Sequence, residues 1–349
     1  TFMLNSLRLT GSFDGASPHS ATLSGSELLF TENLDGAPAN LALEAMGPAY
    51  SFVLKQDLIL YNDLKITGNG NATFVLEGQI SEYQNPTNLS KSGTSTLLIK
   101  SSPKYAGTTS ITEGEIILAE NVTFSSDVII SEEAILSGCG TLTGSLSGAG
   151  TISPGQGIGT LTIQSASPQK LHLEIDGNQA DHLVSTGILD LSKTTLSWST
   201  QNLTEIIYPI ITYNSLVGGF QNIHTPSGYL FDYNYQGNKI ALIRSENAYQ
   251  VWAQQTHTLS GGNALFGADP DLDGIPNGLE FFTGSNPAKF TKNHPLKASR
   301  ISSSTAVSYP LSSLGKATLF RLQSSTDLIN WDDSFPGGQL PTLREEEHF

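Results

Sequence analysis

Residues 138–163 read GCGTLTGSLSGAGTISPGQGIGTLTI, and three segments in this stretch share one pattern. Gly140–Thr143, Gly150–Ser153 and Gly159–Thr162 all begin with Gly-Thr and follow one another at offsets of 10 and 9 residues. The pattern predicts a strand that opens at each Gly-Thr, with the glycine supplying a positive φ at the corner between strands. Short signatures that recur in this way are typical of a β-helix, in which like residues stack in successive turns.

Strands of the same kind are predicted from residue 4 to about residue 245. Segments of 4–6 residues alternate between apolar and polar side chains and are bounded by Gly, Asn, Asp and Ser. Examples are residues 57–61, 63–67, 72–76, 95–100, 114–118 and 127–131. Such spacing also suits a β-sandwich or a hairpin meander, but a sandwich needs larger apolar strands and longer turns. The sequence therefore predicts an all-β fold with a parallel β-helix, a solenoid, over residues 1–245.

The composition narrows the classes of function. Only 14% of the 349 residues are charged, and 32 acidic against 17 basic residues give a net charge of −15. This balance argues against a helical bundle and against a nucleic-acid partner, which would need a basic face. No run of 18 apolar residues is present, so we expect no membrane insertion within this chain. Cys139 is the single cysteine, and the first residues read as a strand already under way, so we expect a piece of a longer protein without internal disulfides.

Three segments of the predicted β-helix resemble a known bacterial family. Residues 91–118 are similar to the passenger-associated transport repeat of autotransporters, with departures at Ser95 and Ile116. Residues 137–144 followed by 150–163, and then residues 177–187, resemble the stretches that commonly follow that repeat, with Gly157 in place of a serine. The resemblance implies a right-handed parallel β-helix, displayed on the outer surface of a Gram-negative bacterium or secreted from it. It implies nothing about catalysis.

A second signal lies in residues 269–280, which read DPDLDGIPNGLE. This matches D-x-D-x-D-G-x-x-N-x-x-E, the spacing of a twelve-residue calcium loop, in which Ca²⁺ takes six to eight oxygen ligands. Gly274 allows the sharp turn that such a loop needs. The predicted ligands are the side chains of Asp269, Asp271, Asp273, Asn277 and Glu280 and the carbonyl group of Ile275. The alternative is an acidic turn that holds no metal.

The calcium loop is expected within a linker, residues 246–290, that separates two β regions. Residues 249–257 predict a short helix, and a second one is expected to start at Glu280 and end at Gly284. The linker resembles the EF-hand-like calcium loops of dockerins and thrombospondin type 3 repeats, with Leu272 in place of the usual Gly or Asn. One loop alone implies a structural clamp. Residues 291–349 are expected to form a partial β module, because residues 319–331 resemble a strand of the modules that follow such linkers.

Other polar residues offer weaker candidates for chemistry. His172, Glu174 and Asp176 would share one face of a strand, with Asp181 and His182 beyond it, as a metal or acid/base site would require. We favour the alternative, a solvent-facing strand whose leucines and isoleucine point inward. A group of aromatic residues could form a platform on which sugars stack, but we favour a cap over the end of the solenoid. These residues are Tyr208, Tyr213, Tyr229, Phe231, Tyr233 and Tyr235.

These observations predict a non-enzymatic, secreted or cell-surface scaffold with one structural Ca²⁺ site. Adhesion or surface display is the expected role, and a glycan or a ligand on a host or neighbouring cell is the expected partner. The alternative is a polysaccharide-binding or polysaccharide-cleaving protein on the same fold. A lyase would need an arginine or lysine base, and no arginine lies between Arg8 and Arg244. No hydrolase, metalloprotease or phosphate-loop motif is present.

Overall fold

The computed structural model describes residues 2–13, 18–222, 224–301 and 304–316. The chain divides into two compact units, Thr1–Ala264 and Leu265–Phe349. Residues 246–264, expected in the linker, group with the first unit, and the expected domain boundaries at 245 and 290 stay predictions. The strand expected at residues 319–331 lies outside the described residues.

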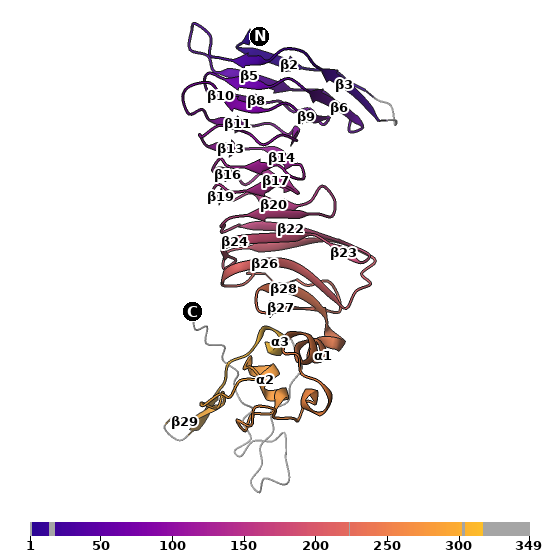
Figure 1. Ribbon diagram of the computed structural model, residues 1–349, viewed down its shortest axis with the longest axis vertical. Coiled ribbons are helices and arrows are strands. Elements are labelled where there is room, and N and C mark those ends of the chain that lie inside the picture. The colour runs from indigo at the N-terminus through magenta and orange to yellow at the C-terminus, as the bar shows by residue number, and fades with distance from the viewer. Residues whose placement is uncertain (1, 14–17, 223, 302–303, 317–349) are drawn as a thin grey trace. The chain divides into compact units, whose positions relative to one another are not determined.

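The first unit is a β-solenoid of about nine turns, built from parallel sheets. Figure 1 shows its strands stacked as successive layers, from indigo at the N-terminal end to salmon at the last turns. One sheet contains β1 (Phe2–Leu4), β4 (Leu28–Phe30), β7 (Leu58–Leu60) and β10 (Ile80–Glu82). A second contains β2 (Ser6–Leu9), β5 (Ala39–Leu43), β8 (Leu64–Thr67), β11 (Leu89–Lys91), β13 (Thr109–Ile111), β16 (Val128–Ile130) and β19 (Leu146–Gly148).

The third sheet is the longest and carries most of the polar outer face discussed below. It contains β3 (His19–Leu23), β6 (Tyr50–Leu54), β9 (Thr73–Leu76), β12 (Thr96–Ile99), β14 (Gly114–Leu118), β17 (Ala134–Gly138), β20 (Thr151–Pro154), β22 (Lys170–Asp176), β23 (Gln179–Ala180) and β25 (Thr195–Gln201). A fourth begins with β15 (Thr123–Phe124), β18 (Thr141–Leu142), β21 (Thr160–Ile163) and β24 (His182–Asp190). The predicted parallel β-helix is confirmed.

Over seven consecutive strands of the third sheet, strand pairing places an apolar side chain at the same inward position. In the third sheet the residues at one inward position are paired in register from strand to strand, and none is more than 6% exposed. They are Phe74, Leu97, Ile116, Leu136, Ile152, Leu171 and Leu196. The neighbouring outward position holds mostly threonine and charged residues. Because side chains alternate along a strand, this one register fixes the inside and the outside of the whole sheet.

The Gly-Thr segments open strands as predicted, but their glycines act differently from the prediction. Positive φ angles occur at the preceding glycines, Gly138 (+107°) and Gly148 (+111°), and not at the Gly-Thr glycines themselves. A Cβ atom on Gly150 would lie 2.1 Å from Cγ2 of Ile130, and one on Gly159 would lie 2.4 Å from Sγ of Cys139. The expected positive φ at the Gly-Thr positions is therefore wrong, because close approach to neighbouring side chains requires glycine there.

The last turns are closed by an antiparallel meander, which confirms the expected cap. The strands β26 (Ile207–Val217) and β27 (Tyr229–Tyr235) pair on either side of β28 (Lys239–Arg244). The side chains of Tyr208, Tyr229 and Phe231 are buried beneath it. Helical turns follow, η1 (Ser245–Asn247), α1 (Ala248–Val251), the π-turn η2 (Trp252–Thr256) and η3 (Gly261–Ala264), in the region where a short helix was expected. The cap covers apolar surface that the final turn would otherwise expose.

The second unit is small, and its described part contains two helices and one hairpin. These are α2 (Asn277–Thr283), β29 (Lys297–Ile301), β30 (Ser304–Ser308) and α3 (Ser313–Lys316). The hairpin is antiparallel. Helix α2 ends at Gly284, which adopts the left-handed conformation with φ of +84°. The predicted stop at Gly284 is confirmed, because a glycine after the last helical residue adopts that conformation without strain.

The cap predicts a pH-dependent contribution to stability from Asp232. Its side chain is 5% exposed, Oδ1 accepts a hydrogen bond from the Asn234 amide at 2.9 Å, and Oδ2 has no hydrogen-bond partner. Burial raises the pKa of Asp232 to about 6, against 3.8 for the free group. The folded state therefore binds more protons than the unfolded state between these values, and this contribution to stability is lost as the pH rises through about 6.

We expect the free energy of unfolding of the wild type, minus that of Asp232→Asn, to fall as the pH rises from about 4 to about 7. Urea unfolding at several pH values measures this difference. Asp181, whose pKa is also raised to about 6 by burial, is present in both proteins and cancels. Asp176→Asn, at an exposed position, is the matched control and should show no such trend. A flat difference for Asp232→Asn would contradict the account of the cap.

Candidate metal centre

The three aspartates at the start of the predicted calcium loop lie together. Among the described residues, Asp269, Asp271 and Asp273 form the one cluster of three acidic, histidine or cysteine side chains with metal-ligating geometry, and one ligand atom of each lies within 4.8 Å of the others. The loop backbone holds them in place. The Asp273 amide donates to Oδ1 of Asp269 and of Asp271, both at 3.2 Å, and the Gly274 amide donates to Oδ2 of Asp269 at 2.9 Å. These bonds turn the chain tightly around the carboxylates.

Asp273 also connects the loop to later parts of the unit. Its Oδ1 atom accepts a hydrogen bond from the Ile275 amide at 2.8 Å, and its Oδ2 atom accepts one from the Thr291 amide at 2.9 Å. The Ile275 side chain is fully buried. Asn277, the first residue of α2, donates its Nδ2 to the Leu265 carbonyl at 2.9 Å. The predicted ligand positions thus belong to one folded element that runs from residue 265 to residue 291.

Glu280 is the residue whose surroundings are hardest to explain without a cation. It lies in α2, is 0% exposed, and neither carboxylate oxygen has a hydrogen-bond partner. Burial, together with the carboxylates of Asp271, Asp273 and Asp269, raises its pKa to about 7, and the nearby Ser285 hydroxyl opposes this rise. The Oδ2 atom of Asp271 is likewise buried without a partner, and burial raises the pKa of this carboxyl. A buried carboxylate beside three others is unfavourable unless a positive charge accompanies it.

The weaker cluster around β22 is satisfied by the solenoid itself. His172, Glu174 and Asp176 share the outward face, whereas Leu171, Leu173 and Ile175 are buried, as expected for a solvent-facing strand. Both ring nitrogens of His172 are hydrogen-bonded, Nδ1 to the Ser197 hydroxyl at 2.8 Å and Nε2 to the Ser199 hydroxyl at 3.0 Å.

Asp181 and His182 are also engaged in holding the fold. Asp181 accepts two backbone hydrogen bonds, at Oδ1 from the Gly159 amide at 2.9 Å and at Oδ2 from the Glu174 amide at 2.8 Å. These bonds join the β22 hairpin to the loop before β21. The His182 ring contacts the Pro209 carbonyl at 3.1 Å and the Thr212 hydroxyl at 2.8 Å. These side chains therefore position strands, and their polar atoms already have partners.

Two more acids line a groove of about 310 Å³ on the outer face of the third sheet. Glu115 accepts a hydrogen bond from the Ser137 hydroxyl at 2.6 Å, and Glu174 also lines the groove. Their strands, β14 and β22, are three positions apart in the sheet. At ~4.8 Å for each step, the two strands lie roughly 14 Å apart. The two carboxylates of a glycoside hydrolase are closer together than that. The groove therefore does not bring these two acids together.

Lys91 is a buried charge that the sequence analysis missed. It is 0% exposed and stands in an inward column between Ile66 and Ile111. Its Nζ atom donates to the carbonyl groups of Ser92, Gly93 and Glu113 at 3.2, 2.6 and 3.3 Å. Burial lowers the pKa of Lys91 to about 8, and Glu113 opposes this. The sequence does contain a sign of this burial. Side chains alternate along a strand, and Lys91 follows the inward-facing Leu89 by two residues, so it also points inward.

No protein-family model matches the chain, and a search of curated proteins finds no match either. Within the described residues, no helix is both long and apolar enough to span a membrane. The family resemblances of the repeats and of the calcium loop therefore rest on the motifs alone.

The calcium loop contains one strained residue, which gives a direct prediction. Leu272 is 80% exposed and has a φ of +62°, in the left-handed region that costs an L-residue about 1–2 kcal/mol. Asparagine tolerates this conformation better. We expect Leu272→Asn to raise the free energy of unfolding of the second unit by about 1 kcal/mol. Chemical denaturation measures this change. Leu265→Asn, at a position 64% exposed with no positive φ, is the control, and an equal gain there would contradict the strain argument.

Proposed function

We propose that the loop of residues 269–280 binds one Ca²⁺ ion as a structural clamp. The observation that carries this proposal is Glu280, whose two buried oxygens lack partners while three carboxylates stand beside it. Four acidic groups with no basic residue in the loop suit a hard divalent cation that prefers oxygen ligands. The residues that would hold the ion are Asp269, Asp271, Asp273, Ile275 through its carbonyl group, Asn277 and Glu280.

The bound ion would supply the positive charge that offsets this acidic cluster. Asp269 and Asp273 already order the turn through backbone amides, so their carboxylates are held in place before an ion binds. Asp273 also accepts a hydrogen bond from the Thr291 amide, so Ca²⁺ binding would stabilise the chain as far as residue 291. Metal binding that requires a folded loop adds directly to folding stability.

We further propose that the protein is a non-enzymatic scaffold that is secreted or displayed on the outer surface of a Gram-negative bacterium. Three features support this: the β-solenoid fold, the motif resemblance to autotransporter passengers, and a calcium loop suited to calcium-rich surroundings. Adhesion or display through a glycan or a cell-surface ligand is the proposed role. The alternative, a polysaccharide-binding or polysaccharide-cleaving protein, would replace it if acidic or neutral polysaccharides release unsaturated or shortened products.

We expect calorimetric titration of Ca²⁺ into chelator-treated protein to show one ion per chain. Asp271→Ala and Glu280→Gln should each abolish or greatly weaken the binding, because each removes a ligand oxygen from the cluster. Asp176→Asn and Glu246→Gln are matched controls at exposed positions outside the loop and should bind as the wild type does. No heat from the wild type, or unchanged heat from both loop variants, would refute the calcium site.

A further inference from the structure

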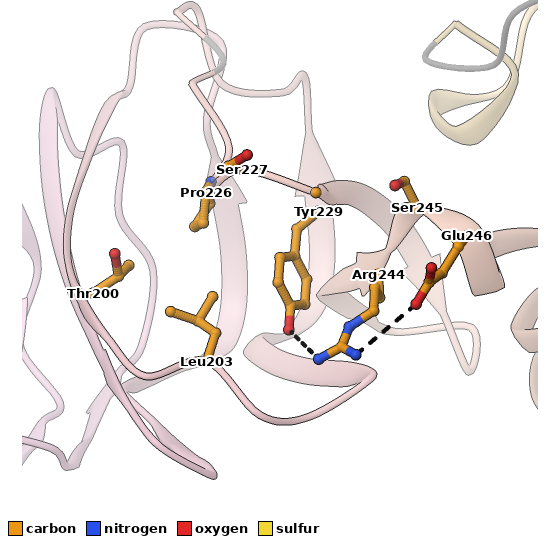
Figure 2. Close-up of a pocket in the computed structure, with 9 residues that line it drawn as sticks. Thr200, Leu203, Pro226, Ser227, Tyr229, Arg244, Ser245 and Glu246 are labelled. Carbon is orange, nitrogen blue, oxygen red and sulfur yellow. Dashed lines mark hydrogen bonds and ion pairs between the residues drawn. The ribbon is translucent and has the colours of Figure 1, made fainter.

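A pocket of about 490 Å³ lies at the cap of the solenoid, within the first unit. Figure 2 shows Thr200 and Leu203 on one side of it and Tyr229 and Arg244 on the opposite side. Its walls come from the end of β25, from the segment before β27 and from the end of β28. Segments far apart in sequence therefore meet here because the cap folds back over the last turn.

Arg244 is the cation of this pocket and is held in a fixed position. Its Nη2 atom donates to the carbonyl groups of Thr204 at 3.1 Å and Glu205 at 3.4 Å and to the Tyr229 hydroxyl at 3.3 Å. Tyr229 is itself fixed, because its hydroxyl donates to the Glu205 carbonyl at 2.6 Å. All three contacts are made by Nη2. Among the described residues, no hydrogen-bond acceptor meets Nη1 or Nε, so Nη1 has N–H donors to offer a ligand.

The charge surroundings make this arginine distinctive. Arg8 and Arg244 are the only two arginines before residue 264, in a chain with a net charge of −15. Glu246 is the one acidic residue in the pocket wall, and its Oε1 atom lies 3.9 Å from Nη1. Its side chain is 73% exposed, so the ion pair is weak and the carboxylate is free to move away. A ligand carboxylate can take its place at Nη1 and accept a charge-assisted hydrogen bond there.

The rest of the wall matches a sugar better than a simple carboxylate. Thr200, Ser227 and Ser245 are exposed and bring three hydroxyl groups to the rim. Leu203 and Pro226 bring apolar surface, which suits the C–H face of a pyranose ring. A volume of about 490 Å³ lies in the range of small-molecule sites. One cation, several hydroxyl groups and an apolar patch together correspond to a sugar that carries a carboxylate.

We propose that this pocket binds a uronic-acid unit of an acidic oligosaccharide, with the carboxylate at Nη1 of Arg244. The proposal rests on the proposed role in glycan binding and names the class of sugar, and it is independent of the calcium loop, which lies in the other unit. The ring hydroxyls of the sugar meet Thr200, Ser227 and Ser245, and its apolar face meets Leu203 and Pro226.

The test is calorimetric titration of the full chain with trigalacturonate, with the neutral galactotriose and with acetate. We expect measurable binding of trigalacturonate and at least about tenfold weaker binding of the other two. Arg244→Gln should weaken trigalacturonate binding at least about tenfold. Arg8→Gln is the matched control. It makes the same substitution at Arg8 of β2, which pairs with Glu44, and it should leave the affinity for trigalacturonate unchanged. Glu246→Gln should tighten binding, because it removes the competing carboxylate.

Thr200→Trp provides a second variant in case Arg244→Gln fails to fold. It fills the pocket from an exposed position and leaves every contact of Arg244 intact, so it should abolish binding in a folded protein. Equal binding of acetate or galactotriose would overturn the proposal, as would absence of binding to the wild type. Equal losses in Arg8→Gln and Arg244→Gln would also overturn it, because they would reveal attraction by overall charge.

Discussion

Register between parallel strands is the constraint on which the rest of this structure depends. Each strand of the solenoid pairs with the equivalent strand of the next turn, so a residue stands above its counterpart rather than above a residue of another kind. The inward column from Phe74 to Leu196 shows the result, an unbroken stack of apolar side chains. A shift by one residue would turn that column to solvent, so the burial of one column fixes the face of every other residue in the sheet.

The same constraint explains why the candidate ligand pocket lies at the cap. A stack of turns buries its own core everywhere except at its ends, where a different arrangement must cover the last layer. Here β26, β27 and β28 change from parallel to antiparallel pairing, and their aromatic side chains fill the space. The reversal brings three chain segments together around Arg244, which also holds the carbonyl groups of Thr204 and Glu205.

Local patterns predicted from the sequence succeed where a single strand or a single loop decides the outcome. The alternation of Leu171, Leu173 and Ile175 gives the buried face of β22, and the twelve residues of the acidic loop bring their three aspartates together. Contacts between segments far apart in the chain could not be predicted from the sequence. The Gly-Thr glycines are needed because side chains of other segments, such as Ile130 beside Gly150, stand against them, and spacing alone does not reveal those neighbours. Lys91 is polar yet buried, since three carbonyl groups that converge only in the fold satisfy it.

Two adjacent residues of β17 test the register most directly. Leu136 is 1% exposed in the inward column, whereas Ile135, its neighbour, is 36% exposed on the outer face. The account predicts that Leu136→Ala lowers the free energy of unfolding by about 2–5 kcal/mol and that Ile135→Ala lowers it by less than about 1 kcal/mol, measured by urea denaturation. Equal losses at the two positions, or a greater loss at Ile135, would contradict the in-register solenoid.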